Sequence, residues 1–161
     1  MSSDIVDRET RSRMMAGIRG ANTKPELAIR RGLHALGFRY RLHDRRLPSK
    51  PDIVLPRYRA VVLVHGCFWH GHDCALFKWP KSRDVFWREK IDRNKLRDAR
   101  AEQALRDEGW RVLRVWECAL KGRGSIGVGG VVAAVADWVR SDLPEDDIRG
   151  INADDGTCRL A

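Results

Sequence analysis

Four side chains that commonly bind metals fall within eight positions of the chain, at Cys67, His70, His72 and Cys74. A further cysteine, Cys118, ends a later stretch that has the pattern of a strand. Zinc in a structural site takes four cysteine or histidine ligands in a tetrahedron, and a loop together with one distant thiolate can supply them. The sequence therefore predicts a structural zinc site with the ligands Cys67, His72, Cys74 and Cys118.

Other ligand sets are compatible with the same residues. The spacing from His72 to Cys74 is not that of a zinc finger, so His70 could replace His72, and Cys158 could replace Cys118. Without a metal, the cysteines would be small buried hydrophobic residues, and the histidines would be hydrogen-bonded locally. The N-terminus has no apolar signal segment, so we expect the four cysteines to serve as ligands or isolated thiols rather than as disulfides.

An aspartate at the head of an apolar strand is the second feature with chemical potential. Asp52 follows a proline and precedes the apolar run 53–55, and a second apolar run occupies 60–64. Phosphodiester hydrolysis uses a hard cation to polarise the phosphate, and Mg²⁺ prefers carboxylate oxygens and water. Asp52 is thus a candidate Mg²⁺ ligand of a nuclease, and the alternative is a turn aspartate. The second run lacks the acidic-x-Lys triplet of such nucleases, so other ligands must come from elsewhere or be main-chain carbonyls.

Two histidines and one aspartate suggest proton transfer. His65 directly follows the second apolar run, and His70 lies five residues further on, so two imidazoles could hold or move a proton near neutral pH. Asp98 lies seven residues from both Ile91 and Leu105, which places it on the apolar stripe of a predicted helix, where a carboxylate needs a partner. A histidine oriented by Asp98 would be a general base. Alternatively, Asp98 is a cap or salt-bridge partner on a basic helix.

The charge distribution favours a nucleic-acid partner. The net charge is +9, and residues 1–140 carry 29 basic and 16 acidic side chains, a net charge of +13. Such an excess attracts a phosphate backbone, because binding releases condensed counterions. A merely basic soluble protein is the alternative.

The elements that must position these residues indicate an α/β fold of three layers, with a central mixed sheet flanked by helices. We expect a single domain at 1–143, beginning with a basic helix within 1–20, and an acidic C-terminal tail at 144–161 that is mobile or loosely packed. No apolar run is long enough to span a membrane, so we expect a cytoplasmic protein. The pattern predicts helices at 7–18, 24–36, 85–107 and 131–143, strands at 38–42, 52–55, 60–64 and 110–117, and a glycine-rich loop at 121–130.

Several unusual motifs are shared with one family. They are His65-Gly66-Cys67-Phe68-Trp69-His70, Phe77-Lys78, Phe86-Trp87-x-x-Lys90-Ile91 and the segment 109–120, with Thr10-Arg11-Ser12, Leu47-Pro48 and Pro51-Asp52 upstream. On these motifs the chain closely resembles the very short patch repair (Vsr) endonucleases over most of its length. The resemblance implies a core like that of restriction endonucleases and nicking of double-stranded DNA 5′ of the thymine in a T·G mismatch left by deamination of 5-methylcytosine. It also implies a monomer, with mismatch-repair proteins as possible partners.

The resemblance further assigns roles to individual residues. Asp52 and the main-chain carbonyl of Val64 would bind Mg²⁺, and Glu26 would reach the water shell of the metal. His70 would be the base, Asp98 would orient it, and His65 would contact the phosphate or the water of the metal. The zinc ligands of the family fall on the same four residues as above: Cys67, His72, Cys74 and Cys118.

Mismatch recognition is expected from aromatic residues. Phe68, Trp69 and Trp87 match the family's aromatics that wedge into the base stack, where a wobble pair costs less to unstack than a Watson–Crick pair. Loop anchoring is the alternative role for Phe68 and Trp69. The N-terminal helix resembles the element that clamps the opposite groove, with the candidate DNA contacts Arg11, Arg13, Met14 and Met15.

The chain departs from the family pattern at two positions. Val64 stands where a threonine is common, and Gly71 interrupts a histidine run. A carbonyl at position 64 can come from any residue, so the first departure leaves the metal site intact. Two alternative functions are a divergent nuclease that cuts other DNA structures and a zinc-stabilised DNA-binding module without catalysis.

Overall fold

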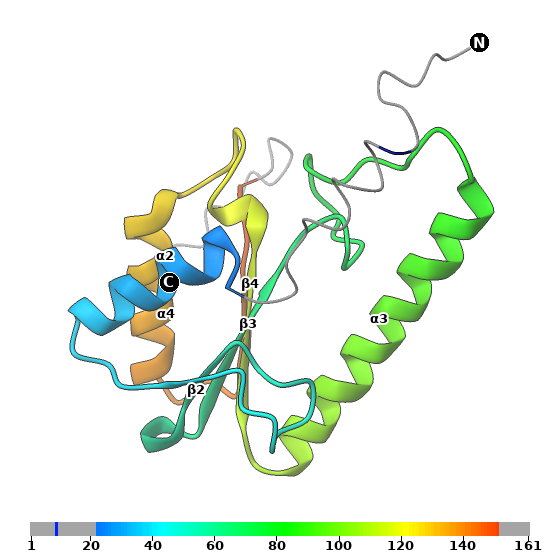
Figure 1. Ribbon diagram of the computed structural model, residues 1–161. Helices are drawn as coiled ribbons and strands as arrows, with labels where there is room; N and C mark the ends of the chain where they lie inside the picture. The colour runs from blue at the N-terminus through cyan, green and yellow to red at the C-terminus, as the bar shows by residue number, and fades with distance from the viewer. Residues whose placement is uncertain (1–8, 10–21, 152–161) are drawn as a thin grey trace.

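Two apolar strands form the middle of a five-stranded sheet in the computed structural model, which describes Glu9 and residues 22–151 (Figure 1). Strands β3 (Ala60–His65) and β4 (Arg111–Trp116) pair in parallel over six residues. On one side, β2 (Ile53–Leu55) pairs antiparallel with β3, and β1 (Arg41–Leu42) pairs antiparallel with β2. The predicted mixed sheet is therefore confirmed. The predicted helix at 7–18 lies, apart from Glu9, outside the described residues.

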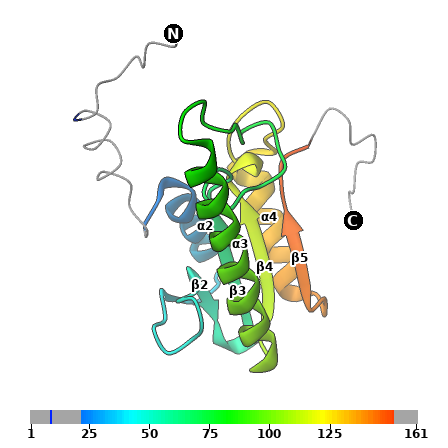
Figure 2. The ribbon, with the colours of Figure 1, turned by 90° about the vertical axis from the view of Figure 1, so that its right-hand side faces the viewer.

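Helices cover both faces of the sheet, as expected for three layers. The two helices α2 (Lys24–Ala35) and α4 (Gly127–Arg140) lie on one face, and α3 (Asp84–Asp107) crosses the other (Figures 1 and 2). Short 3₁₀ turns follow β2 and β4, at Pro56–Tyr58 and Glu117–Ala119. None of the helices among the described residues is long and apolar enough to cross a membrane.

The core follows from the alternation of side chains along the central strands. Val62 points to the face of α2 and α4, where it packs with Leu113 and Val115. Its neighbours Val61 and Leu63 point to the opposite face, under α3. Because both faces are buried, β3 has almost no polar residue before His65, which explains its continuous apolar run.

A glycine on α2 allows α2 and α4 to approach closely. A Cβ atom at Gly32 would lie 2.4 Å from a side-chain carbon of Val132, so a larger residue would push α4 away. Helix α4 begins at Gly127, four residues earlier than predicted, and the predicted loop at 121–130 is wrong over its last part. Three glycines in this turn lower its helix propensity, but the apolar face of the helix packs against the sheet and outweighs this.

The prediction that the chain becomes a loose acidic tail after residue 143 is wrong for residues 145–148, and residues 152–161 of that tail lie outside the described residues. Residues Glu145–Ile148 form β5, which pairs in parallel with β4 at the edge of the sheet. Its acidic character has a partner: Arg114 donates to both Asp147 oxygens, at 2.7 and 2.6 Å, and to Glu102 at 2.5 Å. Ile148 is buried against the core. The three consecutive acidic residues of β5 lack the alternating apolar pattern that predicts a strand. The place of β5 in the sheet depends instead on the contacts of Asp147 with Arg114.

We predict that Asp147→Asn lowers the free energy of unfolding. The amide keeps an acceptor for Trp116 Nε1, which donates to Asp147 at 2.9 Å, but it loses the charge that faces Arg114. Since Asp147 is partly exposed, we expect a loss of about 1–2 kcal/mol in chemical denaturation. Asp142→Asn, at an exposed position outside β5, is the control and should leave stability nearly unchanged. Equal stability of the two variants would show that this ion pair does not hold β5.

The same contact predicts a pH dependence. Burial alone would raise the pKa of Asp147, but the hydrogen bonds from Arg114 and Trp116 and the charge of Arg114 outweigh burial and lower it. A carboxyl group with a lowered pKa in the folded state stabilises that state above its unfolded pKa and loses this contribution as the pH falls. The stability difference between the wild type and Asp147→Asn should therefore shrink below about pH 4.

Candidate active site and metal centre

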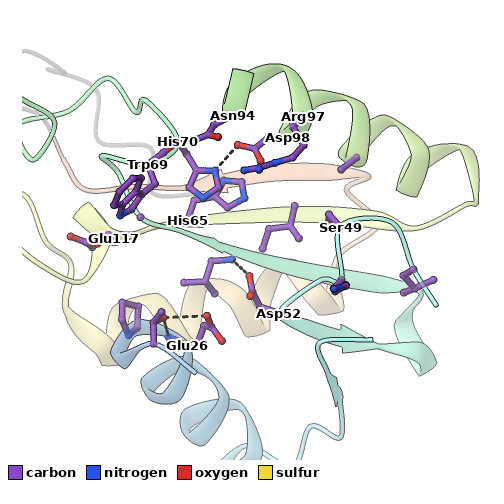
Figure 3. A pocket seen from close by; sticks show the side chains of 18 of the residues that line it. Glu26, Ser49, Asp52, His65, Trp69, His70, Asn94, Arg97, Asp98 and Glu117 are labelled. Carbon is purple, nitrogen blue, oxygen red and sulfur yellow. Dashed lines mark hydrogen bonds and ion pairs between the residues drawn. The ribbon is translucent and has the colours of Figure 1, made fainter. Parts of the chain in front are cut away.

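A pocket of about 1140 Å³ opens beside the end of β3 (Figure 3). It is lined by residues of α2, β3 and α3 and by the loop that precedes β2. Four basic side chains contribute to the lining: Arg45, Lys50, Lys90 and Arg97. These side chains offer positive charge to an anionic ligand, beside the four acidic residues that also line the pocket: Glu26, Asp52, Asp98 and Glu117.

Asp52 lies in this pocket with a second carboxylate. Its Oδ2 accepts a hydrogen bond from the Val64 backbone N–H at 2.7 Å, which ties the start of β2 to the end of β3. Burial raises the pKa of Asp52 to about 6, although the hydrogen bond from Val64 opposes this shift. The Glu26 charge raises it further. Two carboxylates that share a buried site favour the binding of a cation between them.

Glu26 is placed by the helix cap of α2. The sequence Thr23-Lys24-Pro25-Glu26 has the form of a capping box. In the structure the Thr23 hydroxyl accepts from the Glu26 backbone N–H at 3.5 Å, and the Glu26 carboxylate accepts from the Asn22 N–H at 3.0 Å. A glutamate in such a box usually faces solvent, but Glu26 is only 3% exposed. The same interactions that begin the helix thus hold a carboxylate at the pocket, near Asp52 (Figure 3).

His65, His70 and Asp98 form the second titratable cluster of the pocket. His70 Nδ1 lies 2.5 Å from Asp98 Oδ2, and the His65 and His70 rings stack in parallel with their centroids 3.9 Å apart. Burial, together with the neighbouring His70, lowers the pKa of His65 to about 3. His65 is therefore neutral at pH 7, and its Nδ1 has no hydrogen-bond partner among the described residues. Asp98 fixes the proton of His70 on Nδ1, so Nε2 carries the free lone pair.

The loop after β3 places His70 against α3. At Gly71 the backbone has a φ of +60°, and a Cβ atom there would lie 2.6 Å from a side-chain carbon of the buried Ile91. A glycine thus permits the close approach of the loop to α3 that lets His70 reach Asp98, seven residues beyond Ile91 on the same helix. Figure 3 shows this cluster and the two carboxylates on opposite sides of the end of β3.

The structure brings together Cys67, His72, Cys74 and Cys118, whose ligand atoms all lie within 4.8 Å of one another. His72 Nδ1 is 3.6 Å from the Sγ atoms of both Cys67 and Cys118. The pKa of the Cys118 thiol is lowered by the hydrogen bond from the Cys67 thiol, with a further contribution from His72. A thiol that readily loses its proton and a buried imidazole are suitable donors for zinc.

Backbone N–H groups also point at these sulfurs. The N–H of Cys118 donates to Cys67 Sγ, and the N–H of Gly150 donates to Cys118 Sγ, both at 3.3 Å. Such bonds stabilise thiolates and fix the sulfurs in place. The four residues therefore fit a tetrahedral metal site. His70 belongs to the other cluster rather than to this one, and Cys158 lies outside the described residues.

The three predicted wedge residues lie together beside the pocket. The Phe68 ring is 5.1 Å from Trp69 and 5.4 Å from Trp87, and all three are partly exposed. Asn94 donates to the Trp69 carbonyl at 2.9 Å, which anchors the loop to α3. Each of the three rings leaves part of its surface accessible, so the cluster is suited to contact with bases as well as to anchoring the loop. The other predicted DNA contacts, Arg11, Arg13, Met14 and Met15, lie outside the described residues.

Sequence reasoning missed His43. Its Nε2 lies 3.0 Å from Glu26 Oε2 and 3.9 Å from Asp52 Oδ1. No motif marks this residue, but strand pairing could have found it. In an antiparallel pair that aligns Leu42 with Ile53, positions 43 and 52 must be neighbours.

Comparisons with known proteins agree with these features. A family model described as DNA mismatch endonuclease Vsr matches residues 3–76. The chain is 49% identical over 124 residues to the type II nicking enzyme V.XorIIP of Xanthomonas oryzae, which covers 77% of this chain and 91% of that protein. It is 42% identical over 137 residues to the DNA mismatch endonuclease Vsr of Escherichia coli, which covers 85% of this chain and 88% of that protein.

A third relative gives the same result. The type II nicking enzyme V.NmeAIP of Neisseria meningitidis is 47% identical over 121 residues, covering 75% of this chain and 86% of that protein. The three matches each cover at least 86% of the relative and at least 75% of this chain. The chain therefore belongs to the Vsr family of DNA mismatch endonucleases, and it is a DNA-cleaving hydrolase.

Proposed function

We propose that this chain nicks one strand of double-stranded DNA, 5′ of the thymine in a T·G mismatch, in a Mg²⁺-dependent reaction. One observation carries the proposal: a carboxylate pair, Asp52 and Glu26, and a histidine–aspartate pair, His70 and Asp98, line one pocket with basic walls. Phosphodiester hydrolysis needs this combination, a cation site beside a group that takes a proton from water.

Asp52 would hold the magnesium ion together with the main-chain carbonyl of Val64, and Glu26 would reach the ion's water shell. Bound there, the ion would polarise the phosphate and lower the pKa of a water molecule. With a pKa of about 6, Asp52 is ionised at pH 7. The Val64 N–H points at Asp52, and the N–H and C=O of one strand residue face the same side, so the Val64 carbonyl faces Asp52 as well.

His70 would be the general base. Asp98 accepts a hydrogen bond from the Nδ1–H of His70, so Nε2 is free to take a proton from the attacking water. The carboxylate would then stabilise the imidazolium that forms. His65 stays neutral beside it, because its pKa is only about 3. A neutral neighbour in stacking contact does not oppose the charge that His70 gains, and its ring N–H can still donate to a phosphate oxygen.

Specificity for the mismatch would come from Phe68, Trp69 and Trp87. Their partly exposed rings could enter the base stack, where a wobble pair offers less resistance than a Watson–Crick pair. Lys90 supports this cluster, with its Nζ 5.7 Å from the Trp69 ring and 6.0 Å from the Trp87 ring. Arg11, Arg13, Met14 and Met15 of the N-terminal segment would clamp the opposite groove.

The cysteine cluster would hold a structural zinc ion through Cys67, His72, Cys74 and Cys118. Such an ion would join the loop after β3 to the turn after β4, and the loop after β3 carries His70 and two of the three wedge residues, Phe68 and Trp69. We further propose a cytoplasmic monomer, since thiolate ligands persist in a reducing compartment. Mismatch-repair proteins are possible partners of the reaction.

The first test compares a T·G duplex with its matched T·A control. We expect one nick 5′ of the mismatched thymine when Mg²⁺ is present, none with a chelator in place of Mg²⁺, and little cutting of the control on a denaturing gel. Asp52→Asn should lose at least about 10²-fold in nicking rate but should bind DNA almost as well, since phosphate contacts dominate affinity. Equal cutting of both duplexes would favour a nuclease for other DNA structures, and binding without cutting would favour a non-catalytic module.

The second test concerns the proton transfer. Asp98→Asn should reduce the single-turnover nicking rate by about 10²–10⁴-fold, because His70 loses both its orientation and the stabilisation of its charged form. Asp92→Asn on the exposed side of the same helix is the matched control and should nick at the wild-type rate. If the two variants are equally active, His70 is not the base in the proposed arrangement.

The third test concerns zinc. Elemental analysis of protein purified without chelators should give one zinc ion per chain, and Cys74→Ala should lose the ion and melt at a lower temperature. The remaining cysteine supplies the control: Cys158→Ala should keep both zinc and stability. Zinc retained in Cys74→Ala, or lost in Cys158→Ala, would contradict the ligand set.

A further inference from the structure

A third histidine stands among the two carboxylates of the pocket. His43 lies with Glu26 and Asp52 in one group whose ligand atoms are all within 4.8 Å of one another. Its side chain is 26% exposed, whereas those of Glu26 and Asp52 are 4% and 18% exposed. The imidazole is thus the most accessible donor of the three. The roles proposed so far for the pocket do not use it.

The backbone holds His43 at this place at some cost. Its φ is +46°, in the left-handed region, although it is not a glycine. Its N–H donates to the Asp52 carbonyl at 3.4 Å, which continues the β1–β2 ladder by one step and fixes the two residues side by side. A strained residue that the surrounding structure holds in place is typical of functional sites.

We propose that His43 Nε2 is a direct ligand of the divalent cation that Asp52 holds, an inference that rests on the proposed metal-dependent function. Two donors of an octahedral ion with bonds of about 2.1 Å lie between about 3 and 4.2 Å apart. The separation of 3.9 Å between His43 Nε2 and Asp52 Oδ1 falls in this range, and Glu26, 3.0 Å from Nε2, lies beside the two donors. His43 and Asp52 can therefore bind one ion without rearrangement of the backbone, with Glu26 within reach of its water shell.

The two histidines that line the pocket, His65 and His70, are less suited to this ion than His43. His70 is engaged with Asp98 through Nδ1, and His65 is stacked on His70 in the second cluster. His43 alone among these three shares a group with Asp52 and Glu26.

A nitrogen ligand changes which cation the site prefers. Mg²⁺ takes oxygen donors and keeps much of its water, whereas imidazole favours transition metals, which bind nitrogen more strongly. The site should therefore bind Mn²⁺ more tightly than Mg²⁺, and His43 should account for the difference.

The test uses Mn²⁺ as the probe with the full-length, zinc-loaded protein, alone and with a T·G duplex that carries an uncleavable analogue of the scissile phosphate. Pulsed electron paramagnetic resonance should detect ¹⁴N coupling to the bound Mn²⁺, and the coupling should disappear in His43→Gln. Glutamine keeps an N–H donor for Glu26 but lacks the ring nitrogen. In cation titrations, His43→Gln should weaken Mn²⁺ binding about tenfold or more and Mg²⁺ binding much less.

Two controls identify the source of the nitrogen. The coupling should persist in His34→Gln, on the exposed side of α2, and in His70→Gln, in the second cluster. The inference would be overturned if the coupling is lost in His70→Gln or retained in His43→Gln. It would also be overturned if only oxygen atoms bind Mn²⁺, or if Mn²⁺ does not bind with or without the duplex. Wild-type nicking of the T·G duplex with Mg²⁺ would still support the proposed function in each of these cases, whereas loss of mismatch-dependent nicking would refute that function separately.

Discussion

The parallel pairing of β3 with β4 is the constraint on which the site depends. Because parallel strands run in the same direction, both end at one edge of the sheet, and the last pair of residues is His65 with Trp116. The loop after His65 and the turn after Trp116 therefore leave the sheet side by side. Cys67 and Cys118 meet there, and the His72 ring stacks on Trp116 with the centroids 3.9 Å apart. The placement of the cysteine–histidine cluster and of the candidate catalytic loop is thus a consequence of one register.

Backbone N–H groups, more than ion pairs, fix the positions of the two carboxylates in the pocket. Glu26 is held by the first turn of α2, and Asp52 by the N–H of Val64, so each carboxylate is positioned by an element of the fold. Burial of two acidic groups beside each other is unfavourable until a cation neutralises them. Two carboxylates held in this way are suited to bind a cation. Packing of the apolar core offsets the unfavourable free energy of burying them.

The sequence predicted much of this arrangement, and the failures have physical causes. The apolar run at 60–64, the capping box at Thr23 and the cysteine–histidine spacing are local signals, and each corresponds to an observed feature. Strand β5 and the approach of His43 to Asp52 are not local. The first depends on Arg114, more than thirty residues away, and the second depends on strand register. The spacing of polar residues along a sequence does not indicate which residues they contact, so these contacts can be identified only in the structure.

Strand β5 also sets the order in which the centre can be assembled. It follows every other strand of the sheet in the chain, and Gly150, just after it, donates its N–H to Cys118 Sγ. During synthesis β5 is the last strand of the described sheet to emerge from the ribosome, and pairing over a long sequence separation is slow. Until β5 pairs, Arg114 lacks Asp147 and the Cys118 sulfur lacks the backbone N–H of Gly150. A nascent chain thus carries its candidate catalytic residues on an unfinished support until β5 has paired with β4.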